Sequence, residues 1–306
     1  MMYIENLLRV QVTPMKQFRI IFAAMLLMFL FSGCGAQTEI PEIAATTLPV
    51  YEFTSRLCDG TDLTVGQLIT DNVSCLHDYS LNVRQVRTAE AAEVIVISGA
   101  GLEEFMKDIL HDKTVIDSSE GIELIECEES HDHDDHDHHH HDVDSHIWLS
   151  PANARIMSIN ICNGLIAAYP EYTAIFEANL TPLLSDIEAL KIYGETQLSG
   201  LSNRELITFH DGFSYLAEAF DLTILEAVEE ESGSEASASE LKELILLVRE
   251  HQIPAIFTEV NGSSSAASVI ARETGIETFT LDMAMSGNGW FEAMYRNIDT
   301  LKEALE

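Results

Sequence analysis

Short apolar runs that alternate with helical patterns are the feature that most restricts the fold of this 306-residue chain. The clearest run is EVIVIS, residues 93–98, whose apolar centre is typical of a strand buried on both faces of a parallel sheet. The alternation returns after residue 201, with strands expected at 205–209, 222–228, 255–258 and 277–281. We therefore expect an α/β protein with two lobes, each a parallel sheet flanked by helices.

Two helices, expected at 152–168 and 171–197, separate these two sets of strands. The second, at about 27 residues, would be on the order of 40 Å long, enough to join two lobes as a backbone helix. The expected division is a signal peptide at 1–33, a tether at 34–47, an N-terminal lobe at 48–170, a linking helix at 171–200 and a C-terminal lobe at 201–306.

The N-terminus has the pattern of a targeting segment. Lys16 and Arg19 precede an apolar run, residues 20–31, that is too short to span a membrane as a helix. The run ends in LFSGC, and small residues before a cysteine resemble a bacterial lipobox. We expect lipid attachment at Cys34 and an extracytoplasmic protein anchored to the cell membrane, the alternative being an ordinary secretory signal with an incidental cysteine.

The charge balance restricts the partners. Lys and Arg number 16 against 51 Asp and Glu, a formal net charge of −35. A field of this sign repels nucleic acid and attracts cations, so we expect no nucleic-acid partner.

Four cysteines follow Cys34, and none is part of a CxxC pair, which makes a structural zinc–thiolate site unexpected. Sequence alone leaves three pairings open. A bridge between Cys58 and Cys75 is predicted because these cysteines flank one expected strand, with buried reduced thiols as the alternative.

Residues 131–141 form a run of histidines interleaved with acids, within an expected loop at 130–145. The run has no apolar residues, so it cannot pack on a core and should be solvated. Clustered imidazoles and carboxylates suit borderline divalent metals, which predicts an auxiliary, weak metal-collecting loop rather than a simple charged spacer. Its histidines are His131, His133, His136, His138, His139, His140 and His141.

A second group of polar residues is set in ordered sequence. His146 precedes an expected helix start at Ser150-Pro151. His77, His210, Glu259 and Asp282 are the polar residues expected at the carboxyl ends of strands, where parallel sheets place ligands. These residues could converge on one cleft between the lobes. Three imidazoles and a carboxylate suit a tetrahedral zinc ion.

Four stretches carry a resemblance to a known family: residues 76–105, 144–154 (DSHIWLSPANA), 205–220 (ELITFHDGFSYLAEAF) and 273–282 (ETGIETFTLD). They resemble the zinc/manganese-type solute-binding lipoproteins of bacterial ABC importers, and a histidine-rich loop is typical of the zinc-type members. Three departures, Ser145 for the usual Pro, Ser150 for a common Asp, and Leu76 where Pro is common, concern loop shape more than ligand chemistry.

The resemblance implies a metal site of His77, His146 and His210, with Asp282 as the fourth ligand and Glu259 orienting a ligand imidazole. An imidazole at position 210 favours Zn²⁺ over Mn²⁺, since manganese-type members carry a carboxylate there. The implied partners are an ABC permease with its ATPase.

We therefore expect a monomeric, lipid-anchored zinc receptor that is not an enzyme and that delivers Zn²⁺ to an importer. One alternative is a zinc hydrolase, because three histidines with an open fourth position can be catalytic, although the chain has no HExxH signature. The other is a surface adhesin or zinc buffer without transport.

Overall fold

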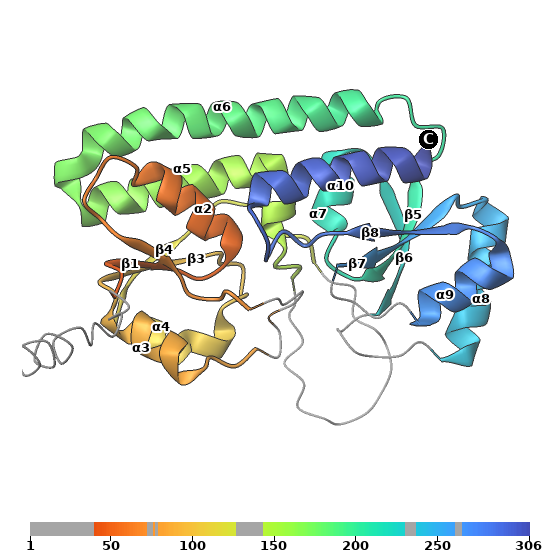
Figure 1. Ribbon diagram of the computed structural model, residues 1–306, viewed down its shortest axis with the longest axis horizontal. Helices are drawn as coiled ribbons and strands as arrows, with labels where there is room; N and C mark the ends of the chain where they lie inside the picture. Colours follow the sequence, from red (N-terminus) through yellow and green to blue (C-terminus); the bar gives the residue numbers. More distant parts are fainter. Residues whose placement is uncertain (1–39, 72–75, 77–78, 127–142, 230–236, 261–264) are drawn as a thin grey trace, which may run out of the picture. The chain divides into compact units, whose positions relative to one another are not determined.

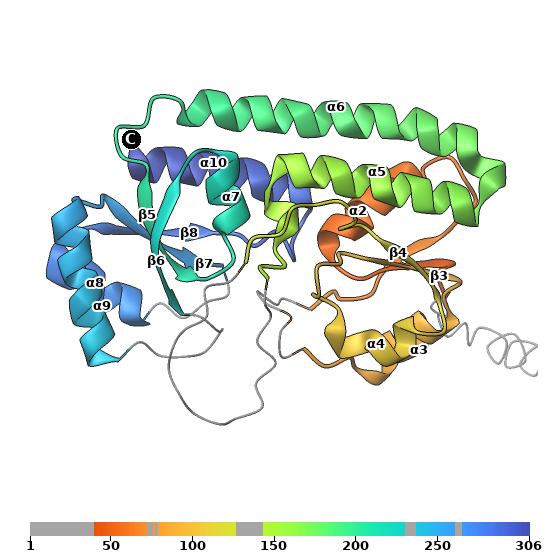
Figure 2. The same ribbon diagram turned by 180° about the vertical axis from the view of Figure 1, so that it is seen from behind.

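The computed structural model describes residues 40–71, 76, 79–126, 143–229, 237–260 and 265–306 (Figure 1; Figure 2 gives the reverse view). Residues 40–306 form one compact unit. It contains two four-stranded sheets, ordered β2-β1-β3-β4 and β6-β5-β7-β8, and their strands pair in parallel. The expected α/β fold with two sheets is confirmed. The N-terminal lobe contains the sheet of β1 to β4, and the C-terminal lobe contains the sheet of β5 to β8.

The N-terminal sheet consists of β1 (Ile43–Ala45), β2 (Val65–Gln67), β3 (Val94–Ile97) and β4 (Thr114–Asp117). The tether expected at 34–47 is too long, because β1 lies between β2 and β3 and is fully buried. Residues 122–125, which follow β4, lead to an isolated antiparallel bridge between Glu126 and Val143.

The helices of this lobe are α2 (Leu48–Leu57), α3 (Val83–Ala91) and the short α4 (Lys107–Leu110), with a 3₁₀ turn, η1 (Glu104–Met106), before α4. Regular structure ends after β3 and resumes only at η1, because Gly99, Ala100 and Gly101 all have positive φ angles.

Two further helices join the lobes. The turn η2 (Ile147–Leu149) leads into α5 (Pro151–Ala168), whose start is capped by the Ser150 hydroxyl, accepting from the backbone N–H of Asn153. After the turn η3 (Pro170–Tyr172), α6 (Thr173–Leu198) continues for 26 residues. It packs against α2 and α5 of the first lobe and α10 of the second, as the expected linking helix would (Figure 1).

The C-terminal sheet consists of β5 (Glu205–His210), β6 (Thr223–Glu229), β7 (Ala255–Glu259) and β8 (Glu277–Leu281). Its helices are α7 (Ser214–Ala219), α8 (Ala238–His251), α9 (Ser265–Thr274) and α10 (Trp290–Leu305). Successive strand residues face opposite layers: Ile207 packs in the cluster formed with α8 and α9, whereas Leu206 belongs to the main core with α7 and α10.

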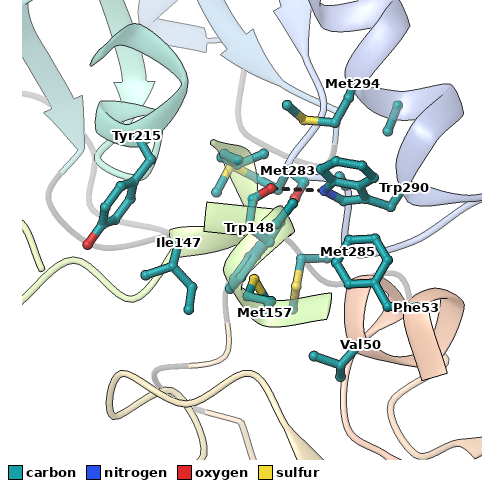
Figure 3. Close-up of a cluster of buried hydrophobic side chains, with 14 of the residues drawn as sticks. Val50, Phe53, Ile147, Trp148, Met157, Tyr215, Met283, Met285, Trp290 and Met294 are labelled. Carbon is teal, nitrogen blue, oxygen red and sulfur yellow. Dashed lines mark hydrogen bonds between the residues drawn. The ribbon is translucent and has the colours of Figure 1, made fainter. Parts of the chain in front are cut away.

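The main core is continuous between the lobes. It includes Phe53 of α2, Trp148 of η2 and Trp290 of α10, all fully buried (Figure 3). Within the described ranges, no helix is long and apolar enough to cross a membrane. The expected signal peptide and Cys34 lie outside those ranges.

The cysteines correct one expectation. Cys58 and Cys162 are buried free thiols, so the predicted bridge from Cys58 to Cys75 is wrong. Cys58 is the C-terminal cap of α2 and packs into the core, where burial raises the pKa of its thiol to about 12. Such a thiol is an inert core residue at neutral pH. Cys75 and Cys127 lie outside the described residues.

Candidate metal site

His146 is the residue of this site whose orientation is best defined. It is buried just before η2, and one carboxylate oxygen of Asp144 accepts both its backbone N–H and its ring Nδ1–H, each at 2.8 Å. The first of these bonds makes a local Asx turn. The second fixes the tautomer, because a ring that donates from Nδ1 carries its lone pair on Nε2. Nε2 is therefore the nitrogen with which His146 can bind a metal.

Asp144 is ionised in this setting. Burial on its own would raise the pKa of Asp144, but the hydrogen bonds and charge of His146, together with the charge of His210, lower it overall. A carboxylate behind a ligand imidazole increases its basicity and hence its affinity for metal. The sequence analysis did not identify Asp144, because this acid follows an acid-rich run. Its signal was the spacing Asp-x-His, which is that of an Asx turn.

Tyr215 of α7 holds the Asp144 segment from the other lobe. Its buried hydroxyl donates to the carbonyl of Asp144 at 3.1 Å and accepts from the backbone N–H of Ile125 at 3.0 Å. The backbone N–H of Asp144 in turn donates to the carbonyl of Ile125. The segments on either side of residues 127–142, at Ile125 and Asp144, are thus hydrogen-bonded to each other and to Tyr215 of the C-terminal lobe.

His210 comes next to His146, from the last position of β5. Both side chains are buried, and their rings lie nearly perpendicular, with centroids 5.3 Å apart. Gly212 permits this approach. A Cβ atom at position 212 would lie 2.8 Å from Cδ2 of His210 and 2.9 Å from Cε1 of His146, closer than real Cβ contacts. Two of the three expected imidazoles therefore meet: His146, which precedes the linking helix in the sequence, and His210, which follows it.

Glu259 and Asp282 lie at the carboxyl ends of neighbouring strands, with Asp282 one residue beyond the partner of Glu259. Glu259 ends β7, Asp282 follows β8, and both are buried. One oxygen of the Asp282 carboxylate accepts the backbone N–H of Ala284 at 2.8 Å, while the other lies 3.7 Å from the guanidinium of Arg296. Asn297 holds the Asp282 backbone, accepting its N–H and donating to its carbonyl. These bonds hold Asp282 in place. A metal ion bound to the Asp282 carboxylate would have to share that group's negative charge with the guanidinium of Arg296.

The remaining expected ligand, His77, lies outside the described residues, as do the seven histidines of residues 131–141. The residues beside His77 are well anchored: Leu76 is fully buried, and the Tyr79 hydroxyl donates to Asp71 and accepts from Gln85. In the part of the chain that the structure describes, no three His, Cys, Asp or Glu side chains come together as a group that could hold a metal ion, so His146 and His210 meet without Asp282 or Glu259 completing such a group. The four-ligand set stays a prediction.

Comparisons with known proteins identify the class of receptor. The family ZnuA, "Zinc-uptake complex component A periplasmic", matches residues 43–304. The high-affinity zinc uptake system protein ZnuA of Bacillus subtilis is 30% identical over 280 residues, which are 86% of this chain and 87% of that protein. The zinc-binding lipoprotein AdcA of Streptococcus pneumoniae serotype 4 is 29% identical over 95% of this chain, and the match spans 62% of AdcA.

The fold agrees with these sequence matches. A crystal structure of ZnuA has a TM-score of 0.74 and 27% identity, covering 86% of this chain and 98% of that one. The likeness includes both parallel sheets and the long helix between them. The chain belongs to the ZnuA family, whose members are metal-binding solute receptors of ABC uptake systems and not enzymes.

Proposed function

We propose that this protein is an extracytoplasmic zinc receptor, anchored through a lipid on Cys34, that delivers Zn²⁺ to the permease and ATPase of an ABC importer. The proposed ligands are His77, His146 and His210, with Asp282 as the fourth. The observation that carries the proposal is the buried pair of His146 and His210, whose rings lie 5.3 Å apart.

The ligand chemistry favours zinc over manganese. Imidazole nitrogen is a good ligand for Zn²⁺, whereas Mn²⁺ prefers carboxylate, carbonyl and water oxygens. Asp144 strengthens this preference, since it orients His146 and raises its basicity. The names of the B. subtilis and S. pneumoniae relatives, which refer to zinc, support the same ion.

The site suits capture and release rather than catalysis. Membership in a solute-binding family excludes the zinc-hydrolase alternative. His210 ends β5, Asp282 follows β8 and His146 precedes the 3₁₀ turn η2, all three within a packed core, so binding by these residues needs little further ordering of the chain. The histidine run at 131–141 has no apolar residue to pack, and its sites should be several and weak.

Zinc titration with a competing chelator tests this division between one built site and several weak ones. Deleting residues 131–141 should lower the number of ions bound per chain and leave one tight site nearly unchanged. His146→Ala should do the opposite, abolishing the tight site and sparing the weak ones. His251→Ala is the matched control, because His251 is a histidine bound to Glu205 at the end of α8. The proposal fails if the deletion removes tight binding or if His146→Ala retains it.

Two cellular measurements test lipid anchoring and zinc delivery. Cys34→Ala should release the protein from the membrane fraction, and a variant that stays bound after a high-salt wash would contradict lipid anchoring. Cells that lack the gene should grow poorly when zinc is chelated, and His146→Ala should fail to restore growth. Growth that does not depend on the protein would instead favour a zinc buffer or an adhesin.

A further inference from the structure

The two tryptophans of the chain form a hydrogen-bonded relay between segments that carry proposed ligands. Trp148, two residues after His146, donates from its indole Nε1 to the carbonyl of Met283, the residue after Asp282, at 2.8 Å. Trp290 donates from its own Nε1 to the carbonyl of Trp148 at 2.9 Å (Figure 3). Both indoles are fully buried, so neither N–H can exchange its partner for water without opening the core.

A third contact connects the relay to α2. The first turn of α10 directs the backbone N–H of Trp290 at the carboxylate of Glu52, which is held against the helix start. Gly289 allows that approach, since a Cβ atom there would lie 3.0 Å from a Glu52 oxygen. The Trp290 ring also packs edge-on against Phe53, with centroids 5.0 Å apart. Helix α2 of the N-terminal lobe thus holds the start of α10 of the C-terminal lobe.

The relay acts on both sides of the site. The Trp148 ring lies 5.3 Å from the His146 ring, so movement of the indole changes the surroundings of that imidazole. The Met283 side chain lies against Gly212, the glycine that also adjoins the rings of His146 and His210. A Cβ atom at Gly212 would lie 2.8 Å from the Met283 methyl group. Holding the Met283 carbonyl therefore fixes both the turn after Asp282 and the side chain beside the histidines.

We propose that Trp148 and Trp290 are positioning residues that set the separation of the His146 and Asp282 segments and thereby the lifetime of the bound ion. The inference rests on the proposed function, because it takes these residues as ligands. Interior packing has discrete arrangements rather than continuous ones, so a lost hydrogen bond in the relay lets the two segments shift relative to each other. Ligands held less precisely bind the ion more weakly and release it faster.

Trp290→Phe tests the proposal, since it keeps an aromatic ring against Phe53 and deletes the N–H to Trp148. We expect zinc to dissociate into excess chelator about 10-fold faster or more, as for loss of other groups that orient ligands. The visible spectrum of the Co²⁺-loaded protein, which depends on coordination geometry, should also change. Phe176→Leu is the control: Phe176 is fully buried in the same core, and its ring packs against Tyr172. It should lower the melting temperature and leave both metal readouts unchanged.

A second variant covers the case in which Trp290→Phe does not fold. Glu52→Gln retains the shape of the partly buried carboxylate but removes its charge at the start of α10, and should accelerate release in the same direction with a smaller effect. Suppose that wild type binds zinc tightly and His146→Ala does not. If Trp290→Phe and Glu52→Gln then leave zinc release and the Co²⁺ spectrum unchanged, the proposed role of the relay is wrong and the proposed function stands. Absence of tight zinc binding in the wild type would overturn the proposed function and this inference with it.

Discussion

Single carboxylates decide much of the local chemistry, and Asp144 is the clearest case. Asp144→Asn keeps an oxygen that can accept the N–H groups of His146 but removes the negative charge behind the imidazole. Zinc affinity should fall by about 10- to 100-fold, the usual cost of losing such a partner. Asp299→Asn is the control, an exposed aspartate that accepts from Tyr193. Chelator competition at pH 7 measures both variants, and equal affinities would remove Asp144 from the site.

Glu103 predicts a pH effect on stability. It accepts from the Thr46 hydroxyl and from the backbone N–H groups of Ser98 and Gly99, but burial outweighs these bonds and raises its pKa to about 7. The folded state then binds a proton more tightly than the unfolded state, whose carboxyl has a pKa of 4.5. Glu103 therefore contributes most to the free energy of unfolding below pH 4.5. That contribution is lost as the pH rises to about 7, by on the order of 1.4 kcal/mol per pH unit.

Glu103→Gln should flatten that dependence, because the amide does not titrate. Urea unfolding at several pH values between 4.5 and 8 measures it, as the difference between wild type and variant. Glu104→Gln, at the exposed neighbouring carboxylate, should leave the wild-type slope unchanged. Parallel curves for wild type and Glu103→Gln would mean that Glu103 is already ionised at low pH.

The site residues differ in how far sequence could predict them. The positions of His210, Glu259 and Asp282 at the carboxyl ends of β5, β7 and β8 were predictable, because alternating strands and helices indicate a parallel sheet, whose strands all end at one edge. Tyr215 was not predictable, since its contact with Asp144 joins residues 71 positions apart and depends on how α7 packs. Nothing in the local pattern distinguishes this tyrosine from an ordinary core residue.

At the scale of elements, α6 shows how packing overrides helix propensity. Alanine is favoured over glycine within a helix by about 1 kcal/mol. At Gly194, however, an added Cβ would lie 2.2 Å from Cε1 of Phe220. Gly194→Ala should therefore destabilise the protein by about 1–3 kcal/mol, as overpacking does.

The urea midpoint measures this effect. Gly200→Ala is the control, because a Cβ there would meet nothing within 4 Å, and it should stay within about 0.5 kcal/mol of wild type. A stabilised Gly194→Ala protein would show that Phe220 can move away without cost, and that α6 does not depend on this close contact with the second lobe.

Elements with a repeating pattern were predictable, and those without one were not. The helix α8 follows its apolar stripe, and its start is marked by a capping box between Ser237 and Glu240. The strand β1 has only three residues, Ile43–Ala45, too few to show a period, although it occupies the interior of its sheet. Its position is fixed by pairing with β2 and β3, which is a tertiary effect.

At the scale of the whole molecule, zinc should stabilise the folded state, because the proposed ligands are distant in sequence and could bind one ion together only in the folded chain. Zinc at 100 times its dissociation constant should add about 2.7 kcal/mol to the free energy of unfolding. The loop-deleted protein should show this effect in full and His146→Ala should lack it, as measured by the melting temperature with and without zinc. Acidification through the range where imidazole protonates should abolish the effect, since only neutral imidazole binds metal.

The two-lobed architecture and the long helix between the lobes could be predicted from the sequence, but the tryptophan contacts between the lobes could not. The indole bonds of Trp148 and Trp290 connect residues 135 and 142 positions apart, and no local pattern encodes them.

The joint between the lobes also provides an optical signal. The chain contains two tryptophans, and both belong to the relay, so intrinsic fluorescence arises almost entirely from that one place. Their burial should give emission at short wavelength, without the red shift of an indole in water. Trp290→Phe leaves a single fluorophore 5.3 Å from the ring of His146. Arrival and departure of the ion could then be followed in real time, in the otherwise unlabelled protein and beside its membrane partner.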